Sequence, residues 1–221
     1  MLAALYSGGK DSTLAIHKMH ELGRDVELLI SLISKNNFSY MLQRVNLEWT
    51  KLQADAMGIK HVFWDSAGEK EKELIDIENA LKENSVTELV TGAVASSYQR
   101  DRINKICEKL GIVHYAPLWG MDSLSELREI AGKFDAIITR VSAAGLDSSF
   151  LGKHITQEIV ERLLKISEKS KINLSFEGGE AESFVLDAQL FKKKIILKKT
   201  HTIWNGDSGD YIIDDAELAD K

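Results

Sequence analysis

The sequence predicts an α/β fold, in which a parallel Rossmann-like sheet carries helices on both faces and a smaller α+β domain follows. Short apolar runs alternate with helical patterns through the first half of the chain, as in successive strand–helix units. The only proline, Pro117, stands where this alternation stops, and roughly the last fifty residues are predicted mostly as strands. We therefore expect one domain at residues 1–121 and a second at residues 122–221.

The first half is predicted to contain four strands and four helices. Glycines follow three of the expected helices, which is typical of helix ends. In the first helix Ala15, Met19 and Leu22 share one face, and in the last helix Cys107 falls on the apolar face, so we expect it to pack in the core. In order, the expected elements are strand 1–6, helix 11–22, strand 26–33, helix 46–58, strand 61–65, helix 69–84, strand 88–94 and helix 99–110.

The second half is predicted to form an α+β domain, in which two helices and one strand come before the last three strands. The turn at 205–210 is rich in Gly, Asp and Asn, which favours a hairpin between the last two strands. Trp119, just before this half, is expected to pack between the domains. The expected elements are helix 123–132, strand 135–141, helix 156–169 and strands 184–186, 194–203 and 211–213.

Composition excludes several classes of protein. The chain has 221 residues, 44% of them hydrophobic, and has no long uncharged apolar run, so we expect no membrane span and a cytoplasmic protein. With one cysteine it has neither an internal disulfide nor a cysteine zinc site. The net charge of −6 disfavours direct nucleic-acid binding, and the basic stretch at 191–200 is predicted to be a strand with a solvated lysine face.

A glycine-rich loop, Ser7 to Ser12, lies between the first strand and the first helix. It is not a Walker loop, because Lys10 precedes Asp11 rather than a hydroxyl residue. Gly8 and Gly9 let the backbone approach an anion, and amides at a helix N-terminus favour negative charge. The hydroxyls at both ends of the loop and the Lys10 ammonium add to this site, whereas Asp11 suits a helix cap or a Mg²⁺ ligand.

The loop Ser7-Gly8-Gly9-Lys10-Asp11-Ser12 resembles the SGGxDS motif of the PP-loop ATP pyrophosphatases, which share the HUP type of nucleotide-binding fold. The resemblance implies that the loop holds the β,γ-pyrophosphate of ATP. It also implies that the α–β bond is cleaved, so that a substrate oxygen takes AMP and pyrophosphate leaves.

Four further stretches resemble the diphthine–ammonia ligases. They cover nearly the whole chain in the family's order: 39–59, 91–120, 145–153 and 177–195. The resemblance implies ATP-dependent amidation of the diphthine carboxylate on elongation factor 2, with free ammonia and an acyl-adenylate. The chain departs from the family pattern at Ala181, where an aromatic residue is usual, at Ser183, where threonine is usual, and at Leu42-Gln43, where an aromatic–histidine pair is common.

The loop and this resemblance together predict the site residues. Lys10, Asp11 and Glu180 are the expected catalytic residues, and Asp11 is the expected Mg²⁺ ligand. Arg100 is a further candidate for contact with phosphate, AMP or the protein substrate. Expected at ATP are Ser7, Gly8, Gly9, Lys10, Asp11, Ser12, Ile33 and Gly92. Expected at the substrate are Tyr98, Arg102, Glu177, Gly178, Gly179, Glu180 and Glu182.

Two other functions stay open at the level of sequence. One is a regulatory protein that binds ATP or AMP without turnover. The other is a PP-loop enzyme that modifies tRNA, although the single core cysteine argues against sulfur transfer. For the ligase the expected partners are ATP with Mg²⁺, ammonium and elongation factor 2 in its diphthine form, and a homodimer is compatible with the sequence.

Overall fold

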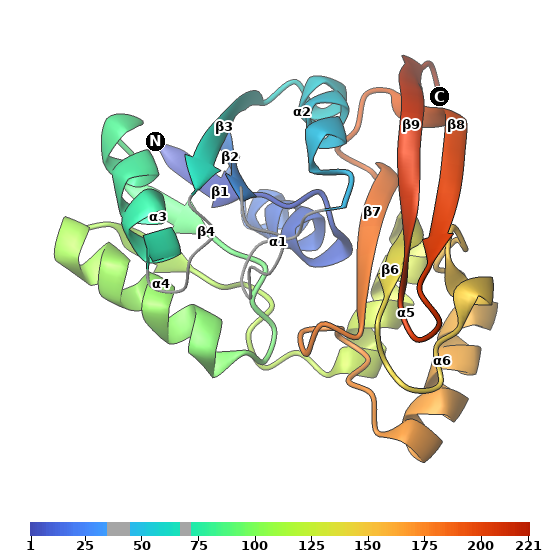
Figure 1. Cartoon of the computed structure of the whole chain (residues 1–221). Coiled ribbons are helices and arrows are strands. Elements are labelled where there is room, and N and C mark those ends of the chain that lie inside the picture. Colours follow the sequence, from blue (N-terminus) through green and yellow to red (C-terminus); the bar gives the residue numbers. More distant parts are fainter. Residues whose placement is uncertain (35–44, 67–71) are drawn as a thin grey trace.

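The protein contains two sheets, one parallel and one antiparallel, that pack side by side (Figure 1). The computed structural model describes residues 1–34, 45–66 and 72–221. Leu42, Gln43 and the first residues of the helix predicted from 69 lie outside these ranges. No helix in the described ranges is long and apolar enough to cross a membrane.

The first sheet is parallel throughout and has the strand order β3-β2-β1-β4-β5. The chain adds β2 and β3 on one side of β1 and then β4 and β5 on the other, so the strand order reverses at β1. In parallel sheets of this kind, ligands bind at the carboxyl ends of the strands beside the point of reversal. The strands are β1 (Leu2–Leu5), β2 (Leu28–Ser34), β3 (Lys60–Ser66), β4 (Glu88–Val90) and β5 (Val113–Tyr115). The helices are α1 (Lys10–Glu21), α2 (Thr50–Met57), α3 (Lys72–Glu83) and α4 (Ser97–Leu110).

Helices cover both faces of this sheet because its strands carry apolar side chains on both faces. Leu2 and Ala4 of β1 belong to a core cluster with α1 and α2, whereas Ala3 belongs to a second cluster with α3 and α4. This is the two-sided burial expected of parallel strands. The predicted parallel sheet with helices on both faces is thus confirmed, and Cys107 is buried in the second cluster as predicted.

Several details differ from the sequence prediction. The fourth strand ends at Val90 rather than at residue 94, and the three-residue β5 was not predicted. The helix expected at 46–58 is divided, because Asn46 has a left-handed backbone and a 3₁₀ turn (Leu47–Trp49) precedes α2. The prediction that Leu22 packs with Ala15 and Met19 was wrong: α1 ends at Glu21, and Leu22 is 70% exposed.

The second sheet is antiparallel, with the order β7-β6-β9-β8, and two helices pack with it. The predicted hairpin is confirmed, since β8 pairs with β9 and Asn205 N donates to Ser208 O at 2.8 Å. The strands β7 and β9 are longer than predicted. The elements are α5 (Ser123–Lys133), β6 (Asp135–Val141), a 3₁₀ turn (Ser148–Phe150), α6 (Gln157–Ser170), β7 (Ala181–Asp187), β8 (Lys194–Trp204) and β9 (Gly209–Ala219).

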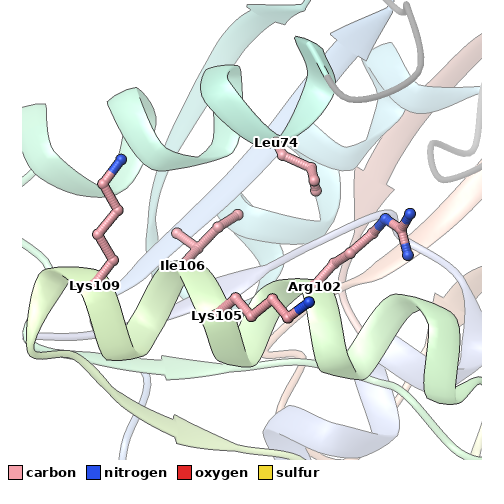
Figure 2. A pocket seen from close by; sticks show the side chains of 5 residues that line it. All are labelled: Leu74, Arg102, Lys105, Ile106 and Lys109. Carbon is pink, nitrogen blue, oxygen red and sulfur yellow. The ribbon is translucent and has the colours of Figure 1, made fainter.

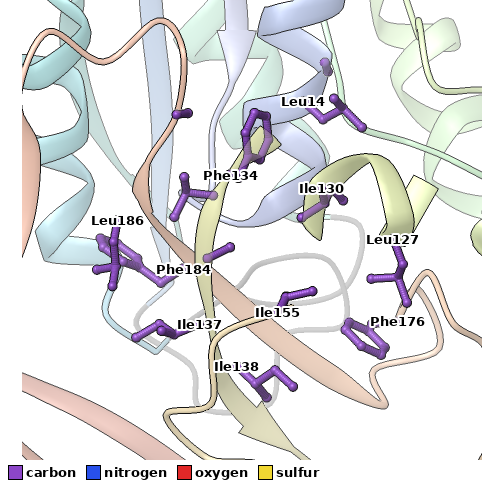
Figure 3. Packing of buried hydrophobic residues seen from close by; sticks show 14 of the residues in the cluster. Leu14, Leu127, Ile130, Phe134, Ile137, Ile138, Ile155, Phe176, Phe184 and Leu186 are labelled. Carbon is purple, nitrogen blue, oxygen red and sulfur yellow. The ribbon is translucent and has the colours of Figure 1, made fainter. Parts of the chain in front are cut away.

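The two sheets share one apolar core, which fixes their relative position. Leu14 of α1 lies in the same cluster as Ile130 and Phe134 of the α5 region and Phe184 of β7 (Figure 3). Burial of large apolar side chains contributes about 1.5–3 kcal/mol each, so this shared core holds the second sheet against α1. Trp49 adds a polar tie, because its Nε1 donates to Ile213 O at 2.8 Å.

Candidate active site

A cavity of about 680 Å³ opens where β1 and β4 end, beside the reversal of strand order. Its volume is within the range of small-molecule sites. The wall on the β1 side is the glycine loop, and the wall on the β4 side continues into the first turns of α4. The third wall comes from the second half of the chain, at residues 176–183. The cavity therefore joins the two sequence segments that predicted the function.

The loop is held from behind by α2, which requires glycine at position 8. Gly8 has a φ of +78°, and a Cβ there would stand 2.5 Å from Gln53 Oε1 and 2.7 Å from Thr50 Cγ2. Gln53 Nε2 also donates to the carbonyl of Gly8 at 2.9 Å. Because the back of the loop is packed in this way, Ser7, Gly9 and the start of α1 line the cavity.

Two hydroxyls and a helix N-terminus meet at the front of the loop. Ser7 Oγ and Ser12 Oγ are 3.3 Å apart, and both residues line the cavity. Gly9 is the N-cap of α1 and has no side chain to cap the helix, although the first-turn amide of Lys10 donates to Ser183 Oγ. Unpaired amides at a helix N-terminus and nearby hydroxyl donors favour an anion such as phosphate.

Gly92 is expected at the nucleotide and lies directly against the loop. A Cβ at this position would stand 2.7 Å from Asp11 C and 2.7 Å from Ser12 N, both backbone atoms. Glycine is needed here because a larger residue would push β4 and the loop apart. Thr91, its neighbour, also lines the cavity, and its Oγ1 lies 2.8 Å from Nε2 of His114.

Lys10 is among the residues that line the cavity, but its ammonium is bonded to groups within the protein, whereas the sequence predicts that it offsets charge on the phosphates. The side chain is 1% exposed, and Nζ donates to Glu126 Oε1 at 2.8 Å, to Ser175 O at 2.9 Å and to Asp11. Burial alone would lower the pKa of Lys10, but the charges of Asp11 and Glu126 outweigh it and raise the pKa. Lys10 is therefore a charged residue behind the loop.

Glu126 was not predicted from the sequence. It lies on α5 and is fully buried, and this burial raises the pKa of its carboxyl against the opposing charge of Lys10. In a helical pattern Glu126 looks like an ordinary surface acid in a first helical turn. Only the contact with Lys10, 116 residues earlier, reveals that it belongs to the site.

Residues 176–183 form the acidic turn, a tight glycine turn followed by the start of β7. Gly179 has a φ of +81°, and its amide donates to Phe176 O at 3.0 Å. A Cβ at Gly178 would stand 2.6 Å from Glu180 Oε1. Both glycines line the cavity, so the turn brings backbone atoms close to any bound ligand.

The three acids of this turn have different surroundings. The carboxylate of Glu177 accepts hydrogen bonds from Val94 N at 2.7 Å and Ala95 N at 2.6 Å. Glu180 accepts from Asn173 N at 3.0 Å and does not line the cavity, contrary to its expected catalytic place. Glu182 lines the cavity. Glu177 thus ties the turn to the segment after β4, and Glu182 is the acid best placed for a ligand.

The acidic turn and the loop also bond directly to each other. Lys10 N donates to Ser183 Oγ at 3.1 Å, across 173 residues of sequence, and Val185 N donates to Gly8 O at 3.1 Å. These bonds fix the distance between the two walls of the cavity. Ala181, the position that departs from the family pattern, is 5% exposed and also lines the cavity.

Besides Gly8 and Glu180, three more of the predicted residues do not line the cavity. Ile33 is exposed, and Ile30 and Leu32 line the cavity instead. Tyr98 is 39% exposed and stacks with Arg102, whose guanidinium carbon is 3.5 Å from the ring centre. The structure therefore does not bring the side chains of these three residues to the cavity with the loop.

Arg102 lines a separate groove between α3 and α4, shown in Figure 2. The groove has a volume of about 250 Å³, and its other lining residues are Leu74, Lys105, Ile106 and Lys109. It does not open onto the glycine loop residues. Arg102 is thus separated from the expected substrate position.

Two arginines contribute cationic side chains to the cavity wall. Arg100, in the first turn of α4, lies 3.6 Å from the ring centre of Trp119, so this tryptophan contacts the nucleotide half and is 37% exposed. Arg140 of β6 pairs with Asp210 at 2.5 Å and was not predicted. Its distance in sequence from the loop left no signal that it reaches the same cavity.

The residues present fit ATP with Mg²⁺. Asp11 lines the cavity, and its side chain is 28% exposed. In the part of the chain that the structure describes, no three His, Cys, Asp or Glu side chains gather as a metal site. Mg²⁺ does not need such a group, because it commonly binds through one or two carboxylates and the phosphates of a nucleotide.

The fold and the loop together define a class, the nucleotide-binding α/β proteins with a PP-loop. The family models for the diphthamide synthase N-terminal and C-terminal domains match residues 1–114 and 122–219. Diphthine–ammonia ligase from Mus musculus is 33% identical, with 91% of this chain and 84% of the relative covered. The relative of the same name from Homo sapiens is 32% identical over the same shares. The chain therefore belongs to the diphthine–ammonia ligase family, which is a family of ligases.

A solved structure from Methanocaldococcus jannaschii, described as a predicted subunit of tRNA methyltransferase, also resembles this chain. The likeness covers 85% of this chain and 97% of that one, with a TM-score of 0.43 and 18% sequence identity. Values this low carry no inference about function.

Proposed function

We propose that the protein amidates the carboxylate of diphthine on elongation factor 2, with ATP and ammonia as the other substrates. The observation that carries the proposal is the junction of the glycine loop and the acidic turn at one cavity. A site for phosphates therefore lies beside a site for a second substrate. The family supports this assignment, because its curated members are named for that reaction.

The first step would form an acyl-adenylate. A carboxylate oxygen of diphthine attacks the α-phosphorus of ATP, the α–β bond breaks, and pyrophosphate leaves. We assign the loop amides, Ser7 and Ser12 to the pyrophosphate oxygens, and Arg100, which also lines the cavity, is a further cation for the nucleotide. Fixed donors of this kind usually supply the largest part of catalysis. Mg²⁺ held by Asp11 would neutralise phosphate charge.

In the second step ammonia attacks the acyl carbon, and AMP leaves with the shared oxygen. The amide forms, and the nitrogen loses one proton to solvent or to a base. Glu177 and Glu182 both line the cavity, but the carboxylate of Glu177 already accepts from two backbone amides, so we assign Glu182 to the trimethylammonium group of diphthine or to the incoming ammonium. Glu180 is assigned to support of the turn instead, because it bonds to Asn173.

The alternatives make different predictions. A nucleotide-binding regulator would release no pyrophosphate when the carboxylate substrate is added. A tRNA-modifying enzyme would bind RNA with an affinity that falls steeply with salt. On the basic strand β8, Lys198 pairs with Glu217 of the neighbouring strand β9, so this lysine is offset by an acid rather than set out for RNA phosphates. We also propose that the reaction takes place in the cytoplasm.

The direct test combines the protein with ATP, Mg²⁺, ammonium and elongation factor 2 arrested at diphthine. Mass spectrometry of the factor should show conversion of the acid to the amide, and nucleotide analysis should show AMP. Omission of ammonium is the matched control, since the amide then cannot form. Formation of ADP, or an unchanged factor, would contradict the proposal.

A further inference from the structure

A buried charged cluster behind the loop joins the nucleotide wall to the second half of the chain. It consists of Lys10, Asp11 and Glu126, with the ammonium of Lys10 in contact with both carboxyl groups. Lys10 is 1% exposed and Glu126 is 0% exposed. Lys10 and Asp11 both line the cavity, but the Asp11 side chain is 28% exposed, and Asp11 is the expected Mg²⁺ ligand.

Simple attachment of α1 to α5 does not account for this cluster. Burial of ionic groups costs several kcal/mol per ion, and well-packed apolar residues often stabilise an interface as well or better. Here the ions instead orient one another, because Lys10 Nζ has three fixed acceptors in Asp11, Glu126 Oε1 and Ser175 O. The Asp11 carboxylate accepts from Lys10 Nζ, and its side chain, which is 28% exposed, also lines the cavity.

We propose that Glu126 is a positioning residue of the nucleotide site. It holds Lys10 behind the loop, so that the ammonium fixes the carboxylate of Asp11 for the metal instead of turning toward the phosphates. This inference rests on the proposed function only in assigning ATP and Mg²⁺ to the cavity. It gives the second half of the chain a role in nucleotide binding, since Glu126 belongs to α5.

The same cluster also supports the acidic turn. Lys10 donates to the carbonyl of Ser175, and its Nζ lies 5.3 Å from the centre of the Phe176 ring. Phe176 has a φ of +65°, so its unusual backbone is held at the start of the turn. Displacement of Lys10 would therefore disturb both walls of the cavity through one side chain.

The structure supplies a matched control on the same pair of helices. Glu129, also on α5, accepts from Lys18 Nζ of α1 at 2.6 Å, but neither residue lines the cavity. Their exposures of 17% and 26% place this pair nearer to solvent. Loss of the Glu129 pair tests attachment of α1 to α5 without disturbing Asp11.

The experiment measures ATP affinity by calorimetry with Mg²⁺ and with EDTA, for wild type, Glu126→Gln and Glu129→Gln. In Glu126→Gln the gain in affinity from Mg²⁺ should fall about 10–100-fold, as for other partners of metal ligands. Affinity in EDTA should stay equal or rise, because the freed Lys10 ammonium can turn toward the phosphates. Glu129→Gln should match wild type in both conditions.

A double substitution tests the route through Lys10 and guards against misfolding. The double variant Lys10→Met with Glu126→Leu removes both partners of the buried pair, which apolar packing tolerates, whereas Lys10→Met alone leaves Glu126 without its ammonium. Both should lack the Mg²⁺ gain to the same extent, because Glu126 acts through Lys10. The inference fails if the double variant loses more of the Mg²⁺ gain in ATP affinity than Lys10→Met alone. It also fails if Glu126→Gln and Glu129→Gln show the same Mg²⁺ gain. A wild type that does not bind ATP would instead refute the proposed function.

Discussion

The glycine loop and the acidic turn meet at one cavity, but their side chains have different tasks. In the loop, backbone atoms and the hydroxyls of Ser7 and Ser12 face the cavity. In the turn, two of the three acids bond to backbone amides within the protein. Local sequence therefore predicts a backbone-built phosphate site well, whereas the task of a carboxylate depends on distant partners.

The largest effect that would sharpen this comparison comes from Gly92→Ala. The added Cβ would meet the backbone of Asp11 and Ser12, so the loop must shift. We expect the free energy of unfolding to fall by about 1–3 kcal/mol, as for other overpacked sites, and ATP affinity to fall with it. Chemical unfolding and calorimetry measure the two effects.

Gly132→Ala is the matched control, because it lies inside helix α5 and its Cβ would have space, with Gln157 Nε2 at 4.0 Å. This variant should be as stable as wild type or more stable, since alanine favours helix over glycine. Equal losses in the two variants would show that the loop does not depend on close packing of Gly92.

A smaller effect separates the acids of the turn. Glu177→Ala would leave the amide of Val94 without its acceptor, at a cost of about 1 kcal/mol in the free energy of unfolding, because this hydrogen bond is only partly buried. Glu182→Gln should instead retain stability and raise the KM for the protein substrate. Unfolding curves and steady-state rates with diphthine-bearing factor distinguish them. If Glu177→Ala is as stable as wild type and Glu182→Gln is less stable, the different tasks assigned to these two acids are contradicted.

The smallest effect concerns acid and the parallel sheet. Burial lowers the pKa of His61 and of His114 to about 4, and Arg100 adds to the effect at His114. Unfolded histidines take up a proton near pH 6.5, so the unfolded state binds more protons between about pH 6.5 and 4. The free energy of unfolding should therefore fall as pH drops through this window.

Urea unfolding at pH 7 and pH 5 measures this loss, with His20→Gln as a control because His20 is 53% exposed. His61→Gln should reduce the loss, and His20→Gln should leave it unchanged. A loss that both substitutions leave intact would place the acid sensitivity elsewhere in the protein.

The elements of the fold were mostly predictable because their patterns are local. Apolar periodicity located four parallel strands and the helices beside them, and glycines marked the ends of α2 and α4. The strand β5 was missed because its three residues are too short to show a period. The prediction for Leu22 was wrong because Leu22 is the C-cap directly after Glu21, where the helical period no longer sets the direction of the side chain.

The site was predictable only where the motif itself makes the contacts. The loop and Gly92 lie at the cavity as expected, whereas Lys10 is paired behind it with Glu126. That pairing joins α1 to α5, and no local pattern records it. The same reason explains Arg140, which reaches the cavity from β6.

The measurement that tests the central claim most directly follows an oxygen atom. The diphthine carboxylate on the factor is labelled with ¹⁸O, and the nucleotide products are analysed by mass spectrometry after amidation. Attack on the α-phosphorus predicts one ¹⁸O atom in AMP for each amide formed, with none in pyrophosphate. Unlabelled AMP, or label in pyrophosphate or phosphate, would contradict cleavage of the α–β bond by the substrate carboxylate.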